Sequence, residues 1–223
     1  MIVRIDGLLG QDELDILNRQ LAELPFKDGR VTASPVAQLV KNNLQLSVDI
    51  EPRIRPLVEM IVKAVERNPL FFAAALPHRI SAPMFNRYDT GMTYGDHVDN
   101  ALIGPDRVRS DVAVTVFLSR PQDYDGGELV IEQASGGQRI KLAAGSAVVY
   151  PATSAHRVEP VTRGTRQASI FWVQSMVRDV ARRRILFDLD VAINRLKERS
   201  GDWPEIGALV ACYHNLLRQW VGV

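Results

Sequence analysis

The chain has 223 residues, of which 46% are hydrophobic and 24% are charged. These are the proportions of an ordinary globular protein, and they exclude a disordered chain, a collagen-like chain and a coiled-coil rod. Charge is balanced at a net +1, so the chain lacks the strong overall field that attracts nucleic acid or an anionic membrane, and we expect neither as a partner.

The compartment is indicated by the cysteine content and the N-terminus. The single cysteine, Cys212, excludes an intramolecular disulfide and favours a reducing compartment. Residues 1–6 show no basic segment followed by a long apolar run, so they do not resemble a secretory signal. No apolar run approaches the roughly 18–20 residues that span a bilayer. We therefore expect a soluble, cytoplasmic protein.

The first 67 residues are predicted to be mostly helical. One helix begins near Gln11, with acidic residues in its first turn, where the helix dipole favours them. A second begins at Pro52 and ends before Asn68-Pro69. Both carry apolar residues at helical spacing: Leu14, Leu17, Leu21 and Leu24 in the first, and Ile54, Leu57, Val58, Ile61, Val62 and Val65 in the second.

From residue 70 onward the pattern changes to short alternating runs separated by Gly, Pro and Asp, which is typical of strands. In the run 111–118, even-numbered residues are predicted to face one side of a sheet and odd-numbered residues the other. Many short strands with little helix between them favour an antiparallel sandwich or barrel of the jelly-roll type. The predicted strands are 70–76, 79–88, 111–118, 128–132, 139–142, 147–150, 156–159 and 167–174.

The tail is predicted to form a helical hairpin that packs on the β core or on a partner. Ser200-Gly201-Asp202 breaks it and Pro204 opens the second helix. The basic run 178–184 is interpreted as a solvated helix face or as a site for an acidic partner. We expect residues 1–178 to form a β domain with N-terminal helices, and residues 179–223 to form a helical extension that is a candidate for self-association. Its apolar stripes are Ile185, Leu189, Ala192, Ile193 and Leu196, then Ile206, Leu209, Val210, Tyr213, Leu217 and Trp220.

Two histidines lie in a pattern typical of a metal site. His97 and Asp99 are two residues apart, so in an extended segment both project to the same face and can present a nitrogen and an oxygen to one cation. His156, at the start of a predicted strand, would complete a facial triad of two histidines and one carboxylate, which is typical of non-haem Fe(II) oxygenases. The alternative is that these histidines are surface residues or satisfied core residues.

Arg166 follows His156 by ten residues, near the start of the predicted strand 167–174. Its planar and permanently charged guanidinium suits bidentate binding of a dicarboxylate. The alternative is an arginine on a solvated face or at a sheet edge.

These motifs, in their order and spacing, resemble a known family: the iron(II)/2-oxoglutarate-dependent dioxygenases of the prolyl 4-hydroxylase type, and most closely the bacterial PKHD-type hydroxylases. The resemblance covers nearly the whole chain, including the helical tail after about residue 180. It implies a double-stranded β-helix, a distorted jelly roll of about eight strands. The motifs that carry it are Lys41-Asn42-Asn43, His97-x-Asp99, Gly126-Gly127-Glu128-Leu129, the stretch from Gly145 to Tyr150, His156 and Arg166.

The resemblance implies a role for each matching residue. His97, Asp99 and His156 would bind Fe(II), and Arg166 would bind the distal carboxylate of 2-oxoglutarate. Tyr88 matches a tyrosine that lies against the cosubstrate in related enzymes, and a core aromatic is the alternative. Oxidative decarboxylation with O₂ would yield succinate, CO₂ and a hydroxylated substrate, with L-ascorbate as a reductant.

Two positions bear on the details of that chemistry. Related halogenases have a small residue in place of the carboxylate ligand, so Asp99 favours hydroxylation. Phe117 is a departure from the pattern, because some eukaryotic relatives have a tyrosine near this position that helps to bind the cosubstrate carboxylate. The hydrogen bond of that hydroxyl must come from elsewhere or be missing.

The substrate is a small molecule or a peptide on this interpretation. Kinship with prolyl 4-hydroxylases implies a peptidyl proline, and a small metabolite related to iron uptake is the second candidate, since some relatives are associated with siderophore uptake. Lys41, Asn42, Asn43 and Tyr94 are candidates for the substrate pocket, and a polar helix end is the alternative for the first three.

Three other functions stay open at this point. The chain could be a non-catalytic jelly roll that binds metal or 2-oxoglutarate as a regulator, although a sensor needs no dicarboxylate clamp at Arg166. It could be an interaction protein with the helical tail as its dimer interface. A nucleic-acid demethylase is disfavoured by the balanced charge and by the lack of a basic, aromatic groove.

Overall fold

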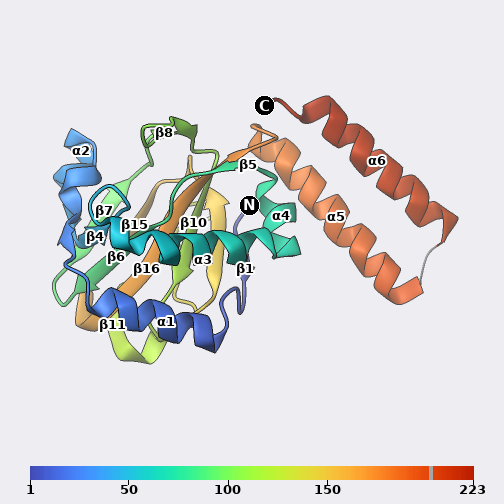
Figure 1. Cartoon of the computed structure of the whole chain (residues 1–223). Coiled ribbons are helices and arrows are strands. Elements are labelled where there is room, and N and C mark those ends of the chain that lie inside the picture. Colours follow the sequence, from blue (N-terminus) through green and yellow to red (C-terminus); the bar gives the residue numbers. More distant parts are fainter. Residues whose placement is uncertain (201–202) are drawn as a thin grey trace.

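The computed structural model describes residues 1–200 and 203–223, so the predicted break at Ser200-Gly201-Asp202 lies largely outside the described residues. Two antiparallel sheets form a jelly roll, and helices cover one face of the larger sheet (Figure 1). The helices are α1 (Gln11–Ala22), α2 (Pro35–Gln38), α3 (Arg55–Glu66), α4 (Pro69–Ala75), α5 (Val180–Ser200) and α6 (Pro204–Trp220), with 3-10 turns at Gly29–Thr32, Pro52–Ile54 and Pro121–Asp123.

The predicted jelly roll is confirmed by the strand pairing. The larger sheet has the order β1 (Val3–Ile5), β14 (Ala147–Pro151), β10 (Val112–Phe117), β16 (Val161–Ser175), β6 (Met84–Asp89), β4 (Leu44–Leu46) and β2 (Lys27–Asp28), while β5 (Pro77–Ile80) and β11 (Tyr124–Gly126) also pair with β16. The smaller sheet has the order β13 (Gln138–Ile140), β12 (Leu129–Ile131), β15 (His156–Val158), β7 (Thr93–His97) and β3 (Lys41–Asn42). A separate pair joins β8 (Leu102–Ile103) to β9 (Val108–Arg109).

Strand β10 separates two cores, as its alternation predicts. Val114 and Val116 pack with α1 and α3 on the helix-covered face. Ala113 and Phe117 pack between the two sheets, where the candidate site lies. Because both faces of β10 are buried, the strand is apolar on both sides apart from Thr115.

The prediction of a strand over 70–76 is wrong, because these residues form α4. Asn68 caps the helix by accepting a hydrogen bond from the backbone N–H of Phe71 at 2.9 Å, and Pro69 occupies the first helical position. An apolar run this short has no period that separates a strand from a buried helix, so the capping residues decide.

Three further predictions about the strands need correction. The first 67 residues contain β1 to β4 besides the two predicted helices, so this part is not mostly helical. The predicted strand 79–88 is two strands, β5 and β6, separated by Ser81-Ala82-Pro83. Strand β16 begins at Val161, so Arg166 lies within the strand and not near its start.

The tail forms the predicted helical pair, with α5 and α6 side by side and α5 against α4 (Figure 1). The predicted stripe on α5 is partly wrong: Ile185 is half exposed, whereas Leu186 is buried with Leu76 and Val177. Arg183, from the basic run, is also buried. None of the helices within the described ranges is long and apolar enough to cross a membrane.

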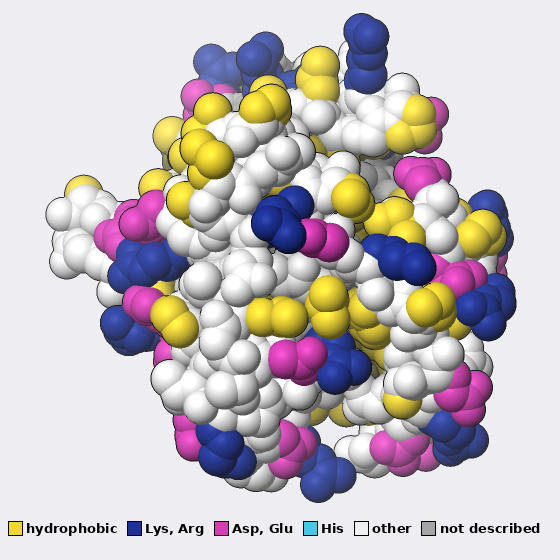
Figure 2. All heavy atoms as spheres, turned by 90° about the vertical axis from the view of Figure 1, so that its left-hand side faces the viewer, with side chains coloured by type: hydrophobic (Ala, Val, Ile, Leu, Met, Phe, Trp, Pro, Cys, Tyr) yellow, Lys and Arg dark blue, Asp and Glu magenta, His cyan; other side chains and the backbone are white. Residues whose placement is uncertain are grey.

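One face of the molecule, which carries α2, mixes side chains of both charges. Figure 2 shows basic and acidic groups interspersed there, with hydrophobic side chains gathered in its upper part. Val36, Leu39 and Leu102 are among the exposed hydrophobic residues. Because the charges on this face are mixed, it does not offer the basic stripe that nucleic-acid binding requires.

Candidate metal centre

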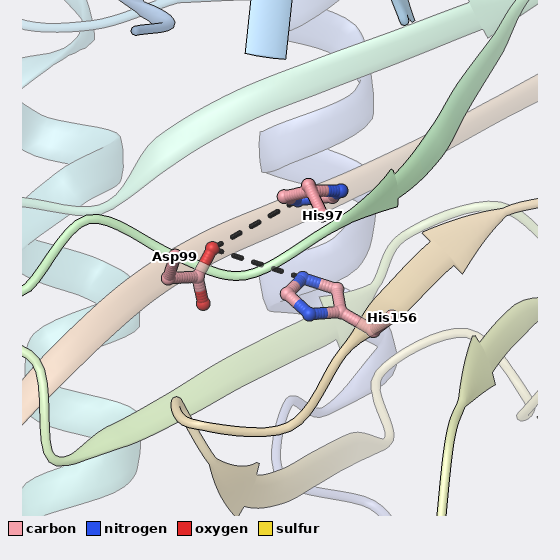
Figure 3. Close-up of side chains that lie close together, drawn as sticks. All are labelled: His97, Asp99 and His156. Atoms are coloured by element: carbon pink, nitrogen blue, oxygen red, sulfur yellow. Dashed lines mark ion pairs between the residues drawn. The ribbon is translucent and has the colours of Figure 1, made fainter. Parts of the chain in front are cut away.

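The strand pairing of β7 with β15 places His97 directly opposite His156. Their ring centroids are 4.2 Å apart, and Asp99 follows just beyond the end of β7. Asp99 Oδ1 lies 3.9 Å from His97 Nε2 and 3.7 Å from His156 Nε2, so the three heads point at one another (Figure 3). Within the described residues, these three form the one group of His, Cys, Asp or Glu side chains that could hold a metal ion.

Both imidazoles are oriented by the backbone. His97 Nδ1 lies 2.8 Å from the carbonyl oxygen of Gly95, and His156 Nδ1 lies 3.0 Å from that of Ser154. With Nδ1–H donating to a carbonyl, Nε2 carries the free lone pair and faces Asp99. This is the arrangement that orients and strengthens histidine ligands in metal sites.

Aromatic rings hold the two histidines from the sides. Tyr94 stacks on His97 at a centroid distance of 3.6 Å, and Tyr150 meets His156 edge-on at 5.3 Å. Burial lowers the pKa of His97 to about 4, so its imidazole is neutral at neutral pH and available as a ligand. Burial also raises the pKa of Asp99.

The three side chains fit a divalent cation. Their facing atoms are too far apart for direct hydrogen bonds, and Asp99 Oδ2 is buried with no hydrogen-bond partner in the described part of the chain. A buried carboxylate oxygen without a partner is unfavourable unless a cation or a donor compensates it. Two imidazole nitrogens and one carboxylate oxygen are the donor set that non-haem Fe(II) uses.

Arg166 supplies a buried positive charge near the metal centre. It is 2% exposed, and its Cζ lies 5.2 Å from the ring centre of Tyr88 and 5.6 Å from that of Phe117. Its Nε makes no hydrogen bond, and no carboxylate of the described residues forms an ion pair with it. Such a guanidinium fits a carboxylate of a bound molecule.

A second polar group beside Arg166 was not predicted from the sequence. Tyr124 is fully buried, and its hydroxyl makes no hydrogen bond within the ranges described. A Cβ at Gly127 would lie 3.1 Å from both the Arg166 side chain and the Tyr124 ring, so both pack against this glycine. Burial raises the pKa of Tyr124, and the nearby Arg166 charge opposes that rise. The Tyr124 hydroxyl is thus available beside Arg166, whereas the Phe117 ring carries no hydroxyl.

A cavity of ≈ 660 Å³ lies against the metal centre, and neither Arg166 nor Tyr124 is among its lining residues. It is lined by the three heads of the metal centre and reaches Tyr88, whose ring contacts Arg166. Of the predicted pocket residues, Lys41 and Tyr94 line the cavity. Asn42 is exposed, and Asn43 is buried against the loop at Gly29, so neither forms part of the lining.

Family comparisons agree with this geometry. Residues 83–174 match the 2OG-Fe(II) oxygenase superfamily, and residues 181–222 match the PKHD-type hydroxylase C-terminal domain. The first match contains β6 to β16, and with them the whole metal centre. The second match shows that the helical pair is a feature shared with relatives of this chain.

Individual proteins give the same result. The chain is 51% identical to a PKHD-type hydroxylase of Burkholderia ambifaria over 99% of both chains. Its structure resembles that of a Pseudomonas putida prolyl-4-hydroxylase, with a TM-score of 0.52 and 19% identity over 78% of this chain and 92% of that one. It also resembles HygX from Streptomyces hygroscopicus, solved with nickel and 2-oxoglutarate bound, with a TM-score of 0.51 and 16% identity over 76% and 81% of the two chains. The chain belongs to the PKHD-type hydroxylases, a family of 2OG-Fe(II) oxygenases.

Proposed function

We propose that the chain is an Fe(II)- and 2-oxoglutarate-dependent dioxygenase in which His97, Asp99 and His156 hold the iron. The observation that carries this proposal is that two free Nε2 atoms and a carboxylate oxygen lie within 4.8 Å of one another beside a cavity. Iron and 2-oxoglutarate, when bound, supply the oxidative chemistry that forms succinate, CO₂ and a hydroxylated product, with L-ascorbate as the proposed reductant.

The chain contributes binding and orientation. Arg166 pairs with the distal carboxylate of 2-oxoglutarate, and Tyr88 lies against the cosubstrate. Because Arg166 is buried, this ion pair is stronger than one at a surface would be. The carbonyl oxygens of Gly95 and Ser154 keep both Nε2 atoms directed at the metal.

Two substrate classes follow from different observations. The likeness to a prolyl-4-hydroxylase supports a peptidyl proline, although likeness at 19% identity concerns the fold. The cavity volume of ≈ 660 Å³ is in the range of small-molecule sites and supports a small metabolite, for which iron uptake is the proposed context.

Succinate release tests the proposal. Wild-type protein is expected to release succinate only when both Fe(II) and 2-oxoglutarate are present in air, and faster when a peptide or metabolite is hydroxylated. Asp99→Ala is expected to abolish this release. Asp96→Ala is the matched control, because Asp96 lies on β7 three residues before Asp99 but is 67% exposed and bound to Arg157. Equal turnover in wild type and Asp99→Ala would contradict the proposal.

A further inference from the structure

The cavity wall carries a buried cation that is separate from Arg166, which does not line the cavity. Lys41, the first residue of β3, lines the cavity wall with 7% of its surface exposed. It is opposite Tyr94 in the pairing of β3 with β7, and the Tyr94 ring stacks on His97. Lys41 therefore shares the cavity with the metal centre, and one aromatic ring links the two.

The ammonium of Lys41 contacts only neutral groups. Its Nζ donates to Thr32 Oγ1 at 3.1 Å and to Gln45 Oε1 at 3.0 Å, and it lies 5.2 Å from the centre of the Tyr94 ring. Asp28, the last residue of β2, is bound by Arg30 through both of its carboxylate oxygens. Two acceptors leave one of the three ammonium protons without a partner in the described residues, and the charges of Asp28 and Asp99 act on Lys41 only from a distance, without an ion pair.

The surrounding chain holds Lys41 in this place. A Cβ at Gly29 would lie 3.1 Å from Lys41 Cε and 1.9 Å from Asn43 Oδ1, so the loop backbone packs tightly on the lysine stem. Burial lowers the pKa of Lys41 to about 8, which still leaves the side chain mainly charged at neutral pH. A buried charge without a counter-ion is unfavourable for folding, which is typical of a group kept for binding.

We propose that Lys41 binds an anionic oxygen group of the substrate, a carboxylate or a phosphate, and holds the substrate beside the metal centre. The proposal rests on the dioxygenase function above and narrows its substrates to acids. Arg166 and Lys41 are two separate buried cations, one packed on the Tyr88 ring and one in the cavity wall, so they suit two separate acids, the cosubstrate and the substrate. A neutral peptide segment would leave the ammonium unpaired, and sites of this kind reject ligands that lack the matching polar group.

Nuclear magnetic resonance of the lysine side chains tests this binding directly. The chain has five lysines, so protein labelled with ¹³C at lysine Cε and loaded with Zn(II) and 2-oxoglutarate gives five assignable signals. The probes are acetate, inorganic phosphate and acetamide, and the Lys41 signal is the one that disappears in Lys41→Met. Lys141 is the control, because its Nζ is bonded to the carbonyl oxygens of Tyr124 and Gly126 and it does not line the cavity.

The Lys41 signal is expected to shift saturably with acetate or phosphate, at a concentration at least about tenfold below that needed for acetamide. Whichever of acetate and phosphate binds more tightly identifies the anionic group of the substrate as a carboxylate or a phosphate. The Lys141 signal should not shift with either anion. No saturable shift at Lys41, or equal shifts with acetate and acetamide, would overturn the proposal.

A second measurement separates this proposal from the dioxygenase function. The affinity for 2-oxoglutarate, read from the visible absorption band formed with Fe(II) without oxygen, is expected to be the same in Lys41→Met and wild type within about twofold. A loss of tenfold or more would assign Lys41 to the cosubstrate and overturn the proposal. Failure of the wild type to form the band would contradict the dioxygenase function instead. Lys41→Gln also removes the charge and replaces Lys41→Met if that variant does not fold.

Discussion

His97 and His156 face each other across β7 and β15, and each turns its Nδ1 back to the carbonyl oxygen two residues before it in the chain. The same local contact thus orients both rings, and both Nε2 atoms point to Asp99. The donor geometry is therefore built largely by strand pairing, which positions a site more firmly than loops do.

Asp99 is expected to matter for metal binding and not for folding. Asp99→Ala should weaken Fe(II) binding by at least about 100-fold, since even residues that only support a ligand contribute 10–100-fold. The metal-free variant should unfold at the same or a higher temperature than wild type, because the substitution removes a buried carboxylate oxygen without a partner. Chelator competition and thermal unfolding measure both effects. Wild-type metal affinity in Asp99→Ala would contradict the assignment, and Asp96→Ala should resemble wild type.

Arg166→Met is expected to weaken 2-oxoglutarate binding by at least about 30-fold, or ~2 kcal/mol, because it removes one partner of a buried ion pair. Arg166→Lys should restore little of the affinity for 2-oxoglutarate, since an ammonium lacks the planar pair of N–H donors of a guanidinium. Anaerobic titration of the Fe(II) protein with 2-oxoglutarate measures the affinity. Arg163→Met, at an exposed ion pair with Asp125, serves as the control. Equal affinity in Arg166→Met and Arg163→Met would show that Arg166 does not bind the cosubstrate.

Tyr124 is expected to supply the hydroxyl that Phe117 lacks. Tyr124→Phe should weaken 2-oxoglutarate binding by about tenfold, the value of one hydrogen bond to a charged group. The double variant Tyr124→Phe/Phe117→Tyr should recover most of this loss, because Phe117 also lies against Arg166. The same titration measures both. If Tyr124→Phe binds 2-oxoglutarate as the wild type does, the hydroxyl has no such role.

The sequence predicts best those features that depend on neighbouring residues. The spacing of His97 and Asp99 predicts two donors on one side of the chain, and the structure brings them together with His156, although Asp99 lies just beyond the end of β7. Tyr124 could not be found in this way, because it reaches Arg166 only through the pairing of β11 with β16. The absence of a hydroxyl at Phe117 left open whether another residue supplies that hydrogen bond, and it gave no indication of which residue this would be.

The fold shows the same limit. Strands β1 to β4 have two or three residues each, too few for a period to show, and they form because neighbouring strands offer backbone partners. On α5 the period predicts an apolar stripe, but the cluster around Leu76 determines which side is buried, so Leu186 packs inward in place of Ile185. The prediction of a strand over 70–76 interprets Asn68-Pro69 only as the end of the preceding helix, whereas Asn68 also caps α4.

The buried charge of Lys41 is expected to make stability depend on pH. Burial lowers the pKa of Lys41 from 10.5 to about 8, so the folded state binds its proton more weakly than the unfolded state does. The buried charge therefore lowers the free energy of unfolding. This destabilisation is fully present below about pH 8, the pKa in the folded state, and absent above about pH 10.5, the pKa in the unfolded state. Lys41→Met should therefore be more stable than wild type at pH 7, by about 1–2 kcal/mol after the loss of two hydrogen bonds.

The free energy of unfolding of Lys41→Met should exceed that of the wild type by less at high pH. We expect the difference to fall by up to ~3 kcal/mol between pH 7.5 and 10.5, as measured by denaturant unfolding. Lys63→Met, at an exposed position on α3, corrects for effects of pH on the whole protein. A stability difference between Lys41→Met and the wild type that stays constant with pH would contradict the burial of an unpaired charge. So would a Lys41→Met variant that is less stable than the wild type by several kcal/mol at pH 7.

Arg183 is expected to anchor the C-terminal helices to the β core. Its guanidinium donates to the carbonyl oxygens of Val177 at 2.7 Å and of Asp111 at 3.2 Å, and it is buried. Arg183→Met should lower the free energy of unfolding by about 2–4 kcal/mol, because it leaves buried carbonyl groups without donors. Arg184→Met, which removes an exposed pair with Asp188, should change it by less than about 1 kcal/mol. Denaturant titration compares the two, and equal effects would show that Arg183 is no anchor.

The most direct measurement is the anaerobic addition of Fe(II) and 2-oxoglutarate to metal-free protein, followed by visible absorption. We predict a band that saturates at one iron per chain and is lost when His97, Asp99 or His156 is replaced by alanine. A band of undiminished strength in any of these three variants, or none in the wild type, would contradict the assignment of the metal centre.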